Sequence, residues 1–298
     1  MGTAGAVCFQ RAGFDVVAWA RNPEKLSQLP AAAEAMHHWL DEHQGPLDRE
    51  PGRLELCSNL EEFAGRVDVI FECISEVMDR KVELFHQLGT AKQRNVLFLS
   101  ATSGLPITEM ARQSGLESLL VGAHFWNPPY LMPLVELIRG DETPSEVFDQ
   151  ACELIASVGK TVVRVEKDVP GFIGNRLQHA MWREAIRLVQ DGVATAEDVD
   201  LVARLTLALR LPVLGPLENA DLVGLELVRD IQSYLLKDLA DDKQPIPLLT
   251  KLIEQGDLGA ATGQGFYDWQ NKTLEEVAER RDKQILQQLR HLGMLKSQ

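Results

Sequence analysis

The order of secondary-structure signals restricts the fold of this 298-residue chain more than any other feature of its sequence. In the first half, short apolar runs alternate with helical stretches, whereas strand signals nearly vanish in the second half. The predicted strands cover residues 14–19, 67–71, 96–99, 119–122 and 161–165, and the predicted helices lie around residues 23–27, 31–43, 78–88 and 145–158. Such alternation is typical of an α/β domain in which helices cover a parallel sheet.

Pro170 and Gly171 mark the boundary between the two halves. Beyond them apolar residues recur at helical spacing, and a capping box at residues 273–276 begins a final amphipathic helix. A chain of this length also suits two domains better than one core. We therefore predict an α/β domain over residues 1–166 and an all-α domain over residues 167–298.

Composition limits the class of protein. Hydrophobic residues make up 45% and charged residues 25% of the chain, as in soluble globular proteins. No apolar run approaches the roughly 20 residues of a membrane helix, and the start lacks a signal-peptide pattern, so we expect a cytoplasmic protein without membrane contacts. The net charge of −14 argues against nucleic-acid binding. Four widely spaced cysteines without a Cys-x-x-Cys pair predict neither a disulfide framework nor a metal site.

His124 is the strongest candidate for a catalytic group. It stands in an apolar, proline-containing segment, and Glu136 follows it after an extended Leu134-Val135 run. Histidine titrates near neutrality, and a nearby buried carboxylate fixes its tautomer and stabilises the imidazolium. The pair therefore suits a general base with an orienting acid. A structural histidine in a buried loop is the alternative that this segment alone leaves open.

Four ordered motifs together resemble the 3-hydroxyacyl-CoA dehydrogenase family. They are H-F-x-N-P with L-V-E-[VL] at residues 124–137, A-T-S at 101–103, P-G-F-I-G-N-R at 170–176 and G-P-x-x-x-x-D-x-x-G at 215–224. The resemblance extends from Met1 to about Trp269. It implies a Rossmann-type doubly wound parallel sheet followed by an all-α domain for substrate binding and dimerisation. It also implies an NAD-dependent alcohol dehydrogenase that forms a homodimer through the helical domain.

The resemblance implies roles for four residues in hydride transfer. His124 would take the hydroxyl proton while Glu136 orients its ring, and Ser103 and Asn175 would bind the substrate by hydrogen-bonding its reacting oxygen. Taken alone, Ser103 would be a turn residue and Asn175 a helix cap. The family usually has asparagine in place of Ala101, so one polar contact is expected to be missing from the strand end that faces the cofactor.

Two charged residues are expected beside the cofactor. Glu76 and Lys81 complete an E-x-x-x-E-x-x-x-x-K segment that starts at Glu72 and lies near the nicotinamide ribose in the family. A solvated helix face would explain the same two residues.

The N-terminus departs from the dinucleotide fingerprint of the family. Gly2 aligns with the last glycine of G-x-G-x-M-G, so the first strand and two glycines are missing. Those glycines let a pyrophosphate approach the helix N-terminus, and loss of a central strand would leave unpaired backbone groups. We expect a misassigned start or a partial gene, with a product longer by roughly 8 to 12 residues. A different segment filling the slot is the alternative, which tight nicotinamide binding by this chain would support.

The cofactor's phosphate preference depends on Ala20 and Arg21. Ala20 stands where the family has an acid that binds the adenosine ribose, and Arg21 follows it. Loss of the acid with gain of an arginine is the change that admits a 2′-phosphate. NADP is therefore possible beside the NAD that the family mostly uses, although an exposed arginine at a helix start is common.

The substrate is expected to be a small hydroxy acid or its coenzyme A thioester. Residues 31–52 contain five acidic residues against Arg49 alone, which disfavours anionic coenzyme A. Residues 127–130 resemble the branch of lambda-crystallin and gulonate 3-dehydrogenase, which acts on free acids, and Arg210 could bind a carboxylate there. A surface cation is the alternative for Arg210. For the whole chain the alternative is a catalytically impaired crystallin-like scaffold or nucleotide-binding protein.

Overall fold

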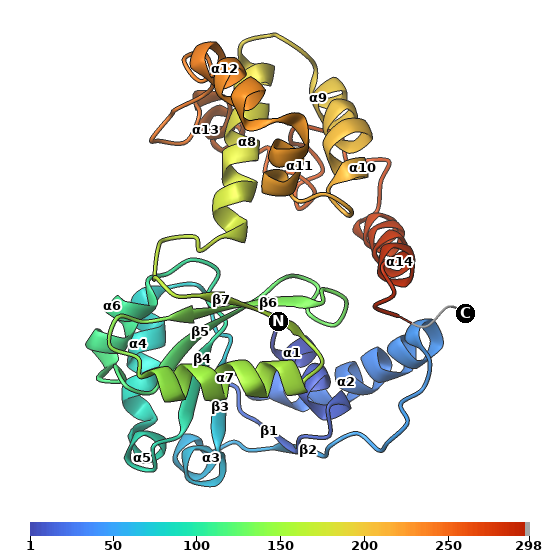
Figure 1. The fold of residues 1–298 in the computed structure, drawn as a ribbon. Helices are drawn as coiled ribbons and strands as arrows, with labels where there is room; N and C mark the ends of the chain where they lie inside the picture. Colours follow the sequence, from blue (N-terminus) through green and yellow to red (C-terminus); the bar gives the residue numbers. More distant parts are fainter. Residues whose placement is uncertain (296–298) are drawn as a thin grey trace. The chain divides into compact units, whose positions relative to one another are not determined.

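The computed structural model describes residues 1–295 and divides the chain into two compact units (Figure 1). Unit 1 is Met1–Arg176, and unit 2 begins at Leu177. The division falls later than the expected residue 166, because the segment after it packs on unit 1. Phe172 is fully buried in the core of that unit, and Asp168 Oδ2 accepts a hydrogen bond from the backbone N–H of Thr108 at 2.8 Å.

Unit 1 alternates strands and helices, as predicted. Its strands are β1 (Val16–Ala18), β2 (Leu54–Leu56), β3 (Val69–Glu72), β4 (Leu97–Ser100), β5 (Leu120–Phe125), β6 (Leu134–Arg139) and β7 (Thr161–Val165). Its helices are α1 (Gly2–Arg11), α2 (Pro23–Gln44), α3 (Leu60–Arg66), α4 (Met78–Gln87), α5 (Gly89–Gln93), α6 (Ile107–Ser114) and α7 (Ser145–Ser157). The prediction of an α/β class with helices on a sheet is confirmed.

The main sheet has the order β3-β4-β5-β6-β7, and it is not wholly parallel as the sequence predicted. Strands β6 and β7 are parallel to each other, but β6 pairs antiparallel with β5. The reason is the connection between β5 and β6, which is residues 126–133. A parallel pair needs a crossover of a dozen or more residues, so this short loop forces a hairpin.

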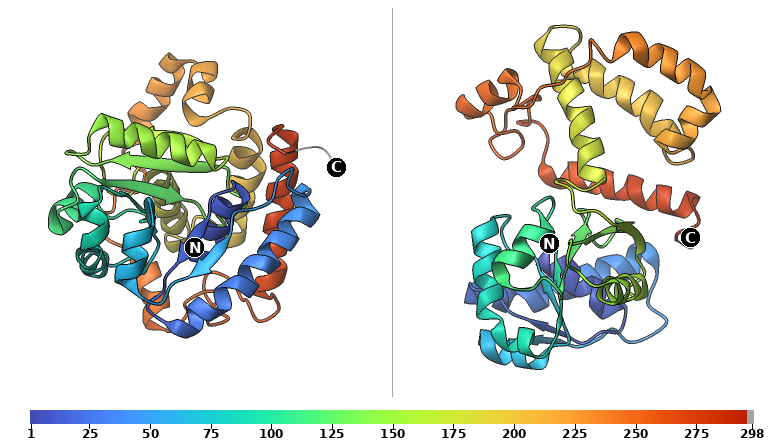
Figure 2. Two further views of the ribbon diagram at one scale, coloured as in Figure 1. Left: turned by 90° about the horizontal axis from the view of Figure 1, so that it is seen from below. Right: turned by 60° about the vertical axis from the view of Figure 1, so that its left-hand side comes forward.

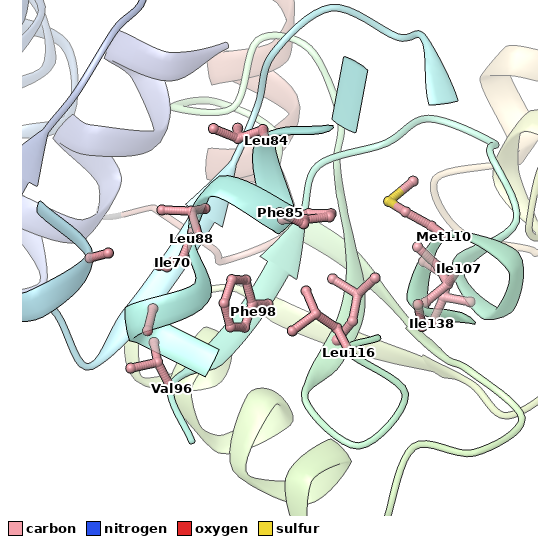
Figure 3. Packing of buried hydrophobic residues seen from close by; sticks show 14 of the residues in the cluster. Ile70, Leu84, Phe85, Leu88, Val96, Phe98, Ile107, Met110, Leu116 and Ile138 are labelled. Carbon is pink, nitrogen blue, oxygen red and sulfur yellow. The ribbon is translucent and has the colours of Figure 1, made fainter. Parts of the chain in front are cut away.

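Both faces of the main sheet are covered by helices. Alternate residues of the central strands point to opposite faces, as the pleat requires. One face packs under α4, α5 and α6, and its core is drawn in Figure 3; it includes Ile70, Phe98, Leu120 and Ile138. The other face packs against α7 and includes Leu99, Val121, Ala123, Val135 and Leu137.

A separate two-stranded sheet holds β1 and β2. Within residues 1–295, β1 pairs only with β2, and β3 pairs only with β4. All three side chains of β1 are half-buried, and Phe71 of β3 is covered by Phe9 of α1, with ring centroids 5.8 Å apart. The sequence missed β2 because two of its three residues are exposed. The upstream extension suggested by the fingerprint stays a prediction.

Helix α2 is a single helix where the sequence predicted two. It continues through Pro30, which removes one helical hydrogen bond. The helix persists because its buried residues Leu26, Ala33 and Leu40 recur every seven positions and lie on one face. Ala33 and Leu40 pack with Val7 of α1.

In its described residues, unit 2 consists of helices joined by loops (Figure 2). They are most of α8 (Gly174–Gln190), α9 (Ala196–Val202), the π-helical turn η1 (Ala203–Leu207), α10 (Ala208–Arg210), α11 (Pro216–Val223), α12 (Leu225–Leu235), α13 (Pro247–Glu254) and α14 (Leu274–His291). The predicted capping box at Thr273 and Glu276 is confirmed at the start of α14. None of the helices over residues 1–295 combines the length and hydropathy required to cross a membrane.

Candidate active site

His124 and Glu136 are directly opposite each other on β5 and β6. His124 Nδ1 lies 2.8 Å from Glu136 Oε2, and both side chains are buried. The contact exists because the two strands form an antiparallel hairpin, in which opposed residues put their side chains on the same face. Among the described residues none hydrogen-bonds Nε2 of His124, which leaves that nitrogen for a ligand.

The second oxygen of Glu136 is held by backbone at the start of α8. Oε1 accepts hydrogen bonds from the N–H groups of Ile173 at 2.9 Å and Gly174 at 3.0 Å. Burial by itself raises the pKa of Glu136, but the hydrogen bonds from His124, Gly174 and Ile173 outweigh burial and lower the pKa. A carboxylate that stays ionised at neutral pH can stabilise an imidazolium.

Two aromatic rings flank the imidazole of His124. The ring centroid of Trp126 lies 4.9 Å away, and that of Phe172 lies 5.7 Å away. Trp126 also packs on Gly174, where a Cβ atom would stand 2.2 Å from Trp126 Cζ2. Only glycine therefore permits both this packing and the N–H bond to Glu136. Sequence reasoning missed Trp126 because the H-F-x-N-P motif leaves its position open.

The loop between β5 and β6 is tied to the start of β7 by Lys160. Its Nζ donates to the carbonyl oxygens of Pro129 at 2.6 Å and Met132 at 2.9 Å. Burial lowers the pKa of Lys160. The next residue, Thr161, donates its N–H to Pro133 O at 2.8 Å. These bonds fix the hairpin that carries the His124–Glu136 pair, a role that no motif in the sequence indicates.

Ser103 and Asn175 meet beside this pair. Asn175 Nδ2 donates to the carbonyl oxygen of Ser103 at 2.6 Å, and Asn175 directly follows the two residues that bind Glu136. The side chain of Ser103 is exposed. Ala101 is buried, and its N–H donates to the Glu72 carbonyl at 2.7 Å, so this strand end is anchored through backbone.

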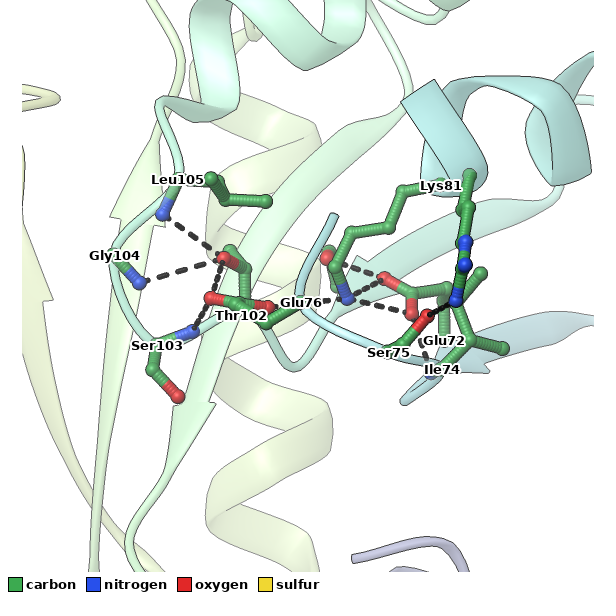
Figure 4. A network of polar contacts seen from close by, with 11 residues as sticks. Glu72, Ile74, Ser75, Glu76, Lys81, Thr102, Ser103, Gly104 and Leu105 are labelled. Carbon is green, nitrogen blue, oxygen red and sulfur yellow. Dashed lines mark hydrogen bonds and ion pairs between the residues drawn. The ribbon is translucent and has the colours of Figure 1, made fainter. Parts of the chain in front are cut away.

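A polar network holds the turn that carries Ser103 (Figure 4). Glu76 Oε1 accepts hydrogen bonds from Thr102 Oγ1 and from Ser103 N, both at 2.6 Å. Thr102 Oγ1 in turn accepts from Leu105 N at 3.0 Å. In Figure 4 the hydroxyl of Ser103 points away from Glu76. The network fixes the backbone and leaves that hydroxyl available.

Lys81 is placed differently from the expectation that it contacts a cofactor. Its side chain is fully buried, and Nζ lies 2.8 and 3.0 Å from the two carboxylate oxygens of Glu72 and 3.4 Å from Glu76 Oε2. A buried ammonium requires a buried counter-charge, and Glu72 supplies it. Sequence reasoning grouped Glu72 with Glu76 and Lys81 near the cofactor, but it did not predict that Glu72 is the counter-charge of Lys81.

The remaining candidates lie outside this network. Gly2 begins α1, and a Cβ atom there would lie 3.4 Å from the sulfur of Cys73, one residue beyond β3. Ala20 and the exposed Arg21 lie between β1 and α2. Arg210 ends α10 in unit 2; it is exposed, and its Nε donates to Thr206 O at 3.3 Å.

The site lies at the carboxyl ends of β3, β4 and β5, which is where open α/β sheets bind their ligands. The sheet with helices on both faces defines an α/β protein with a Rossmann-type unit and a buried histidine–carboxylate pair at this edge. Residues 1–169 match the family description "3-hydroxyacyl-CoA dehydrogenase, NAD binding domain", and residues 171–269 match "3-hydroxyacyl-CoA dehydrogenase, C-terminal domain". The chain belongs to the 3-hydroxyacyl-CoA dehydrogenase family of NAD-dependent oxidoreductases that act on CH–OH groups.

Similar proteins carry several names. A probable 3-hydroxybutyryl-CoA dehydrogenase of Deinococcus radiodurans is 37% identical over 274 residues, which cover 90% of this chain and 96% of that protein. An L-carnitine dehydrogenase of Streptomyces griseus is 37% identical over 227 residues, 75% of this chain and 67% of that protein. The crystal structure of 5-formyl-3-hydroxy-2-methylpyridine 4-carboxylic acid 5-dehydrogenase superposes with a TM-score of 0.92 at 26% identity and covers 98% of this chain and 95% of that one.

The family, the fold class and the enzyme class predicted from the sequence are thereby confirmed. Hydrogen bonds and one ion pair join Ser103, Glu76, Lys81 and Asn175 in one polar network, and Asn175 directly follows the backbone that binds Glu136. The roles assigned to these residues stay proposals.

Proposed function

We propose that this chain oxidises the hydroxyl-bearing carbon of a 3-hydroxy acid, or of its coenzyme A thioester, with His124 as general base. The observation that carries the proposal is the buried 2.8 Å contact between His124 Nδ1 and Glu136. A carboxylate at Nδ1 keeps the proton on that nitrogen, so Nε2 is left as the acceptor. General bases of this kind take a proton as hydride leaves the adjacent carbon.

The chain's own residues would bind the substrate oxygen and move its proton. His124 Nε2 accepts the hydroxyl proton, and Glu136 balances the charge that develops on the ring. Ser103 Oγ and the free N–H of the Asn175 amide donate to the reacting oxygen and fix its position. The nicotinamide ring, when bound, accepts the hydride.

The start of α1 suits the pyrophosphate of such a cofactor. Its first turn has no side-chain cap and no acidic residue, and it begins at Gly2 beside the carboxyl end of β3. Uncapped amides at a helix N-terminus bind phosphates. We propose further that Glu76 contacts the nicotinamide ribose and that Lys81 contributes to the same cofactor site from its buried position. Ala20 and Arg21 stand where the adenosine ribose would bind, so the 2′-phosphate of NADP is also admitted.

For the substrate we favour a free carboxylic acid over a thioester. The acidic residues of the 31–52 segment disfavour coenzyme A, and Arg210 has an exposed guanidinium to bind a carboxylate. Two of the similar proteins are named for carnitine and for a pyridine carboxylate, which are both compact carboxylates. A third is named for 3-hydroxybutyryl-CoA, so the thioester is the competing substrate.

The test is a substrate screen that follows nicotinamide absorbance. Gulonate, carnitine, 3-hydroxybutyrate and 3-hydroxybutyryl-CoA are each offered with NAD and with NADP. For a free acid, Arg210→Ala is expected to raise KM by about 10- to 100-fold, because a charge-assisted hydrogen bond contributes roughly 1.5–3 kcal/mol. Arg204→Ala, at a nearby exposed arginine, is the matched control and should leave KM unchanged.

The outcomes separate the alternatives. Turnover confined to the thioester would contradict the free-acid assignment and the role of Arg210. Any NADP-dependent turnover should decline in Arg21→Ala, whereas turnover with NAD should not. Nucleotide binding without turnover of any hydroxy acid or thioester would favour a catalytically impaired scaffold.

We also propose a homodimer formed through unit 2. In the described part of that unit, helices α9 to α13 contain no buried side chain, and large apolar residues are widely exposed, such as Leu217 at 81%, Val213 at 72% and Leu222 at 71%. Monomeric proteins rarely leave contiguous apolar surface uncovered, and two-fold dimers are the commonest assemblies.

Light scattering tests this assembly. The mass in solution is expected to be twice the 33.2 kDa of the chain. Leu217→Glu should shift the mass towards the monomer, because it would bury a carboxylate in an apolar interface. Leu56→Glu, on the exposed β2 of unit 1, should leave the dimer intact. A wild-type mass of one chain would contradict the proposal.

A further inference from the structure

Glu72 is a buried carboxylate without a role in the proposed reaction. It ends β3 and is 3% exposed. Its oxygens accept hydrogen bonds from Lys81 Nζ at 2.8 and 3.0 Å, Ser100 Oγ at 2.6 Å and Ile74 N at 2.7 Å. An ionised carboxylate has about four acceptor positions. Glu72 therefore has none left for a ligand, and its function must lie in what its partners do.

Lys81 is the partner that leads towards the site. It is fully buried, and its ammonium lies between the carboxylates of Glu72 and Glu76. The contacts with Glu72 are the shorter ones, at 2.8 and 3.0 Å against 3.4 Å for Glu76 Oε2. Glu72 thus carries most of the neutralisation of this buried charge.

Glu76 divides its two oxygens between Lys81 and the turn that carries Ser103. Oε2 faces Lys81, whereas Oε1 accepts from Thr102 Oγ1 and Ser103 N, both at 2.6 Å. The carbonyl of Ser103 then accepts from Asn175 Nδ2. A continuous series of polar contacts, most of which is drawn in Figure 4, therefore leads from Glu72 to the two proposed oxygen donors.

We propose that Glu72 is a positioning residue for Ser103, an inference that rests on the function proposed above. Glu72 neutralises the buried ammonium of Lys81. The ammonium therefore attracts only one oxygen of Glu76, which is Oε2. The other oxygen remains on Thr102 and Ser103. Without the charge of Glu72, Lys81 draws both oxygens of Glu76, because attraction between charges is strong where water is excluded. The Ser103 amide then loses its acceptor and the turn shifts.

The kinetic test compares Glu72→Gln with a matched pair of buried serines. We expect Glu72→Gln to lower kcat by about 10- to 100-fold, since misplacement of a reacting contact by ~1 Å can cost ~10²-fold. Ser100→Ala removes one bond to Glu72 and should cause a smaller loss in the same direction. Ser114→Ala removes a similarly buried hydroxyl, bonded to Met110 O, and should leave kcat unchanged.

A double-mutant cycle separates positioning from general destabilisation. If Glu72 acts through Ser103, then Glu72→Gln causes no further loss of kcat in a Ser103→Ala background. A loss by the same factor in both backgrounds would overturn the inference. Full activity of Ser103→Ala by itself would instead refute the proposed role of Ser103, so the two failures are distinguishable.

Amide hydrogen exchange gives a readout that does not depend on activity. In Glu72→Gln the amides of residues 102–105 should exchange at least several-fold faster, with other segments unchanged, because local protection reports local opening. The variant Glu72→Gln/Lys81→Met should regain slow exchange there, since no ammonium competes for Glu76. It also removes the unpaired buried cation if the single variant folds poorly. Wild-type exchange at 102–105 in folded Glu72→Gln, or no recovery in the double variant, would overturn the inference.

Discussion

Replacing His124 with glutamine is expected to reduce kcat by about 10²–10⁴-fold, the usual contribution of a positioned general base. Glutamine can still donate to Glu136 but cannot accept a proton. Its amide also fills the space between the flanking rings of Trp126 and Phe172. Cofactor affinity, measured by fluorescence titration of the reduced nucleotide, should therefore stay nearly unchanged.

The matched control for this prediction is His86→Gln. His86 is exposed on α4, and its replacement should affect neither kcat nor cofactor affinity. Equal loss of turnover and of cofactor affinity in His124→Gln would contradict the general-base assignment, because it would show that the histidine serves the fold or the nucleotide.

Replacing Glu136 with glutamine should combine a catalytic loss with a loss of stability. The amide oxygen can still accept from Ile173 and Gly174, but the amide cannot carry the charge that balances a protonated His124. We expect kcat to decrease by about 10²-fold, which is the low end of the usual contribution of general acid–base catalysis. Stability should decrease by about 1–3 kcal/mol, because a buried hydrogen bond to His124 is lost or distorted.

The loss of stability in Glu136→Gln should depend on pH in a defined direction. The fold lowers the pKa of Glu136, so the carboxylate stabilises the native state above its ordinary pKa, and this contribution disappears as the pH falls through the lowered value. The gap between wild type and Glu136→Gln, measured as urea midpoints, should thus be full at neutral pH and shrink in acid. Glu109→Gln, at an exposed carboxylate of α6, should show no such gap. A gap that widens in acid would contradict the assignment.

Local sequence patterns were sufficient for the class of fold and for part of the site. Strands with alternating or continuous apolar residues, such as β4 and β5, were predicted to within a few residues because their periodicity comes from burial on a fixed sheet. The His124–Glu136 pair was predicted from residue chemistry and from the motif around it. Its geometry came from the hairpin, since a one-residue change of register would place the two side chains on opposite faces.

Partners far apart in sequence could not be predicted in the same way. The sequence placed Glu72 and Lys81 in one segment near the cofactor, but only the packing showed that the two side chains pair inside the protein. Trp126 and Gly174 are forty-eight positions apart in the sequence, and the residues around each of them do not predict their contact. Such contacts depend on how the folded chain arranges its loops around the sheet.

The sequence by itself determined the α/β and all-α halves, the family and the histidine–carboxylate pair, because periodicity and motif spacing are local properties of a chain. Only the tertiary structure decided the reversal of β6 and β7, the inclusion of residues 167–176 in unit 1 and the burial of Lys81 against Glu72. Each of these features depends on which groups are buried next to one another in the folded protein. A charge or a backbone polar group that is buried in the core needs a hydrogen-bond or ion-pair partner, and the partner can come from a distant part of the sequence.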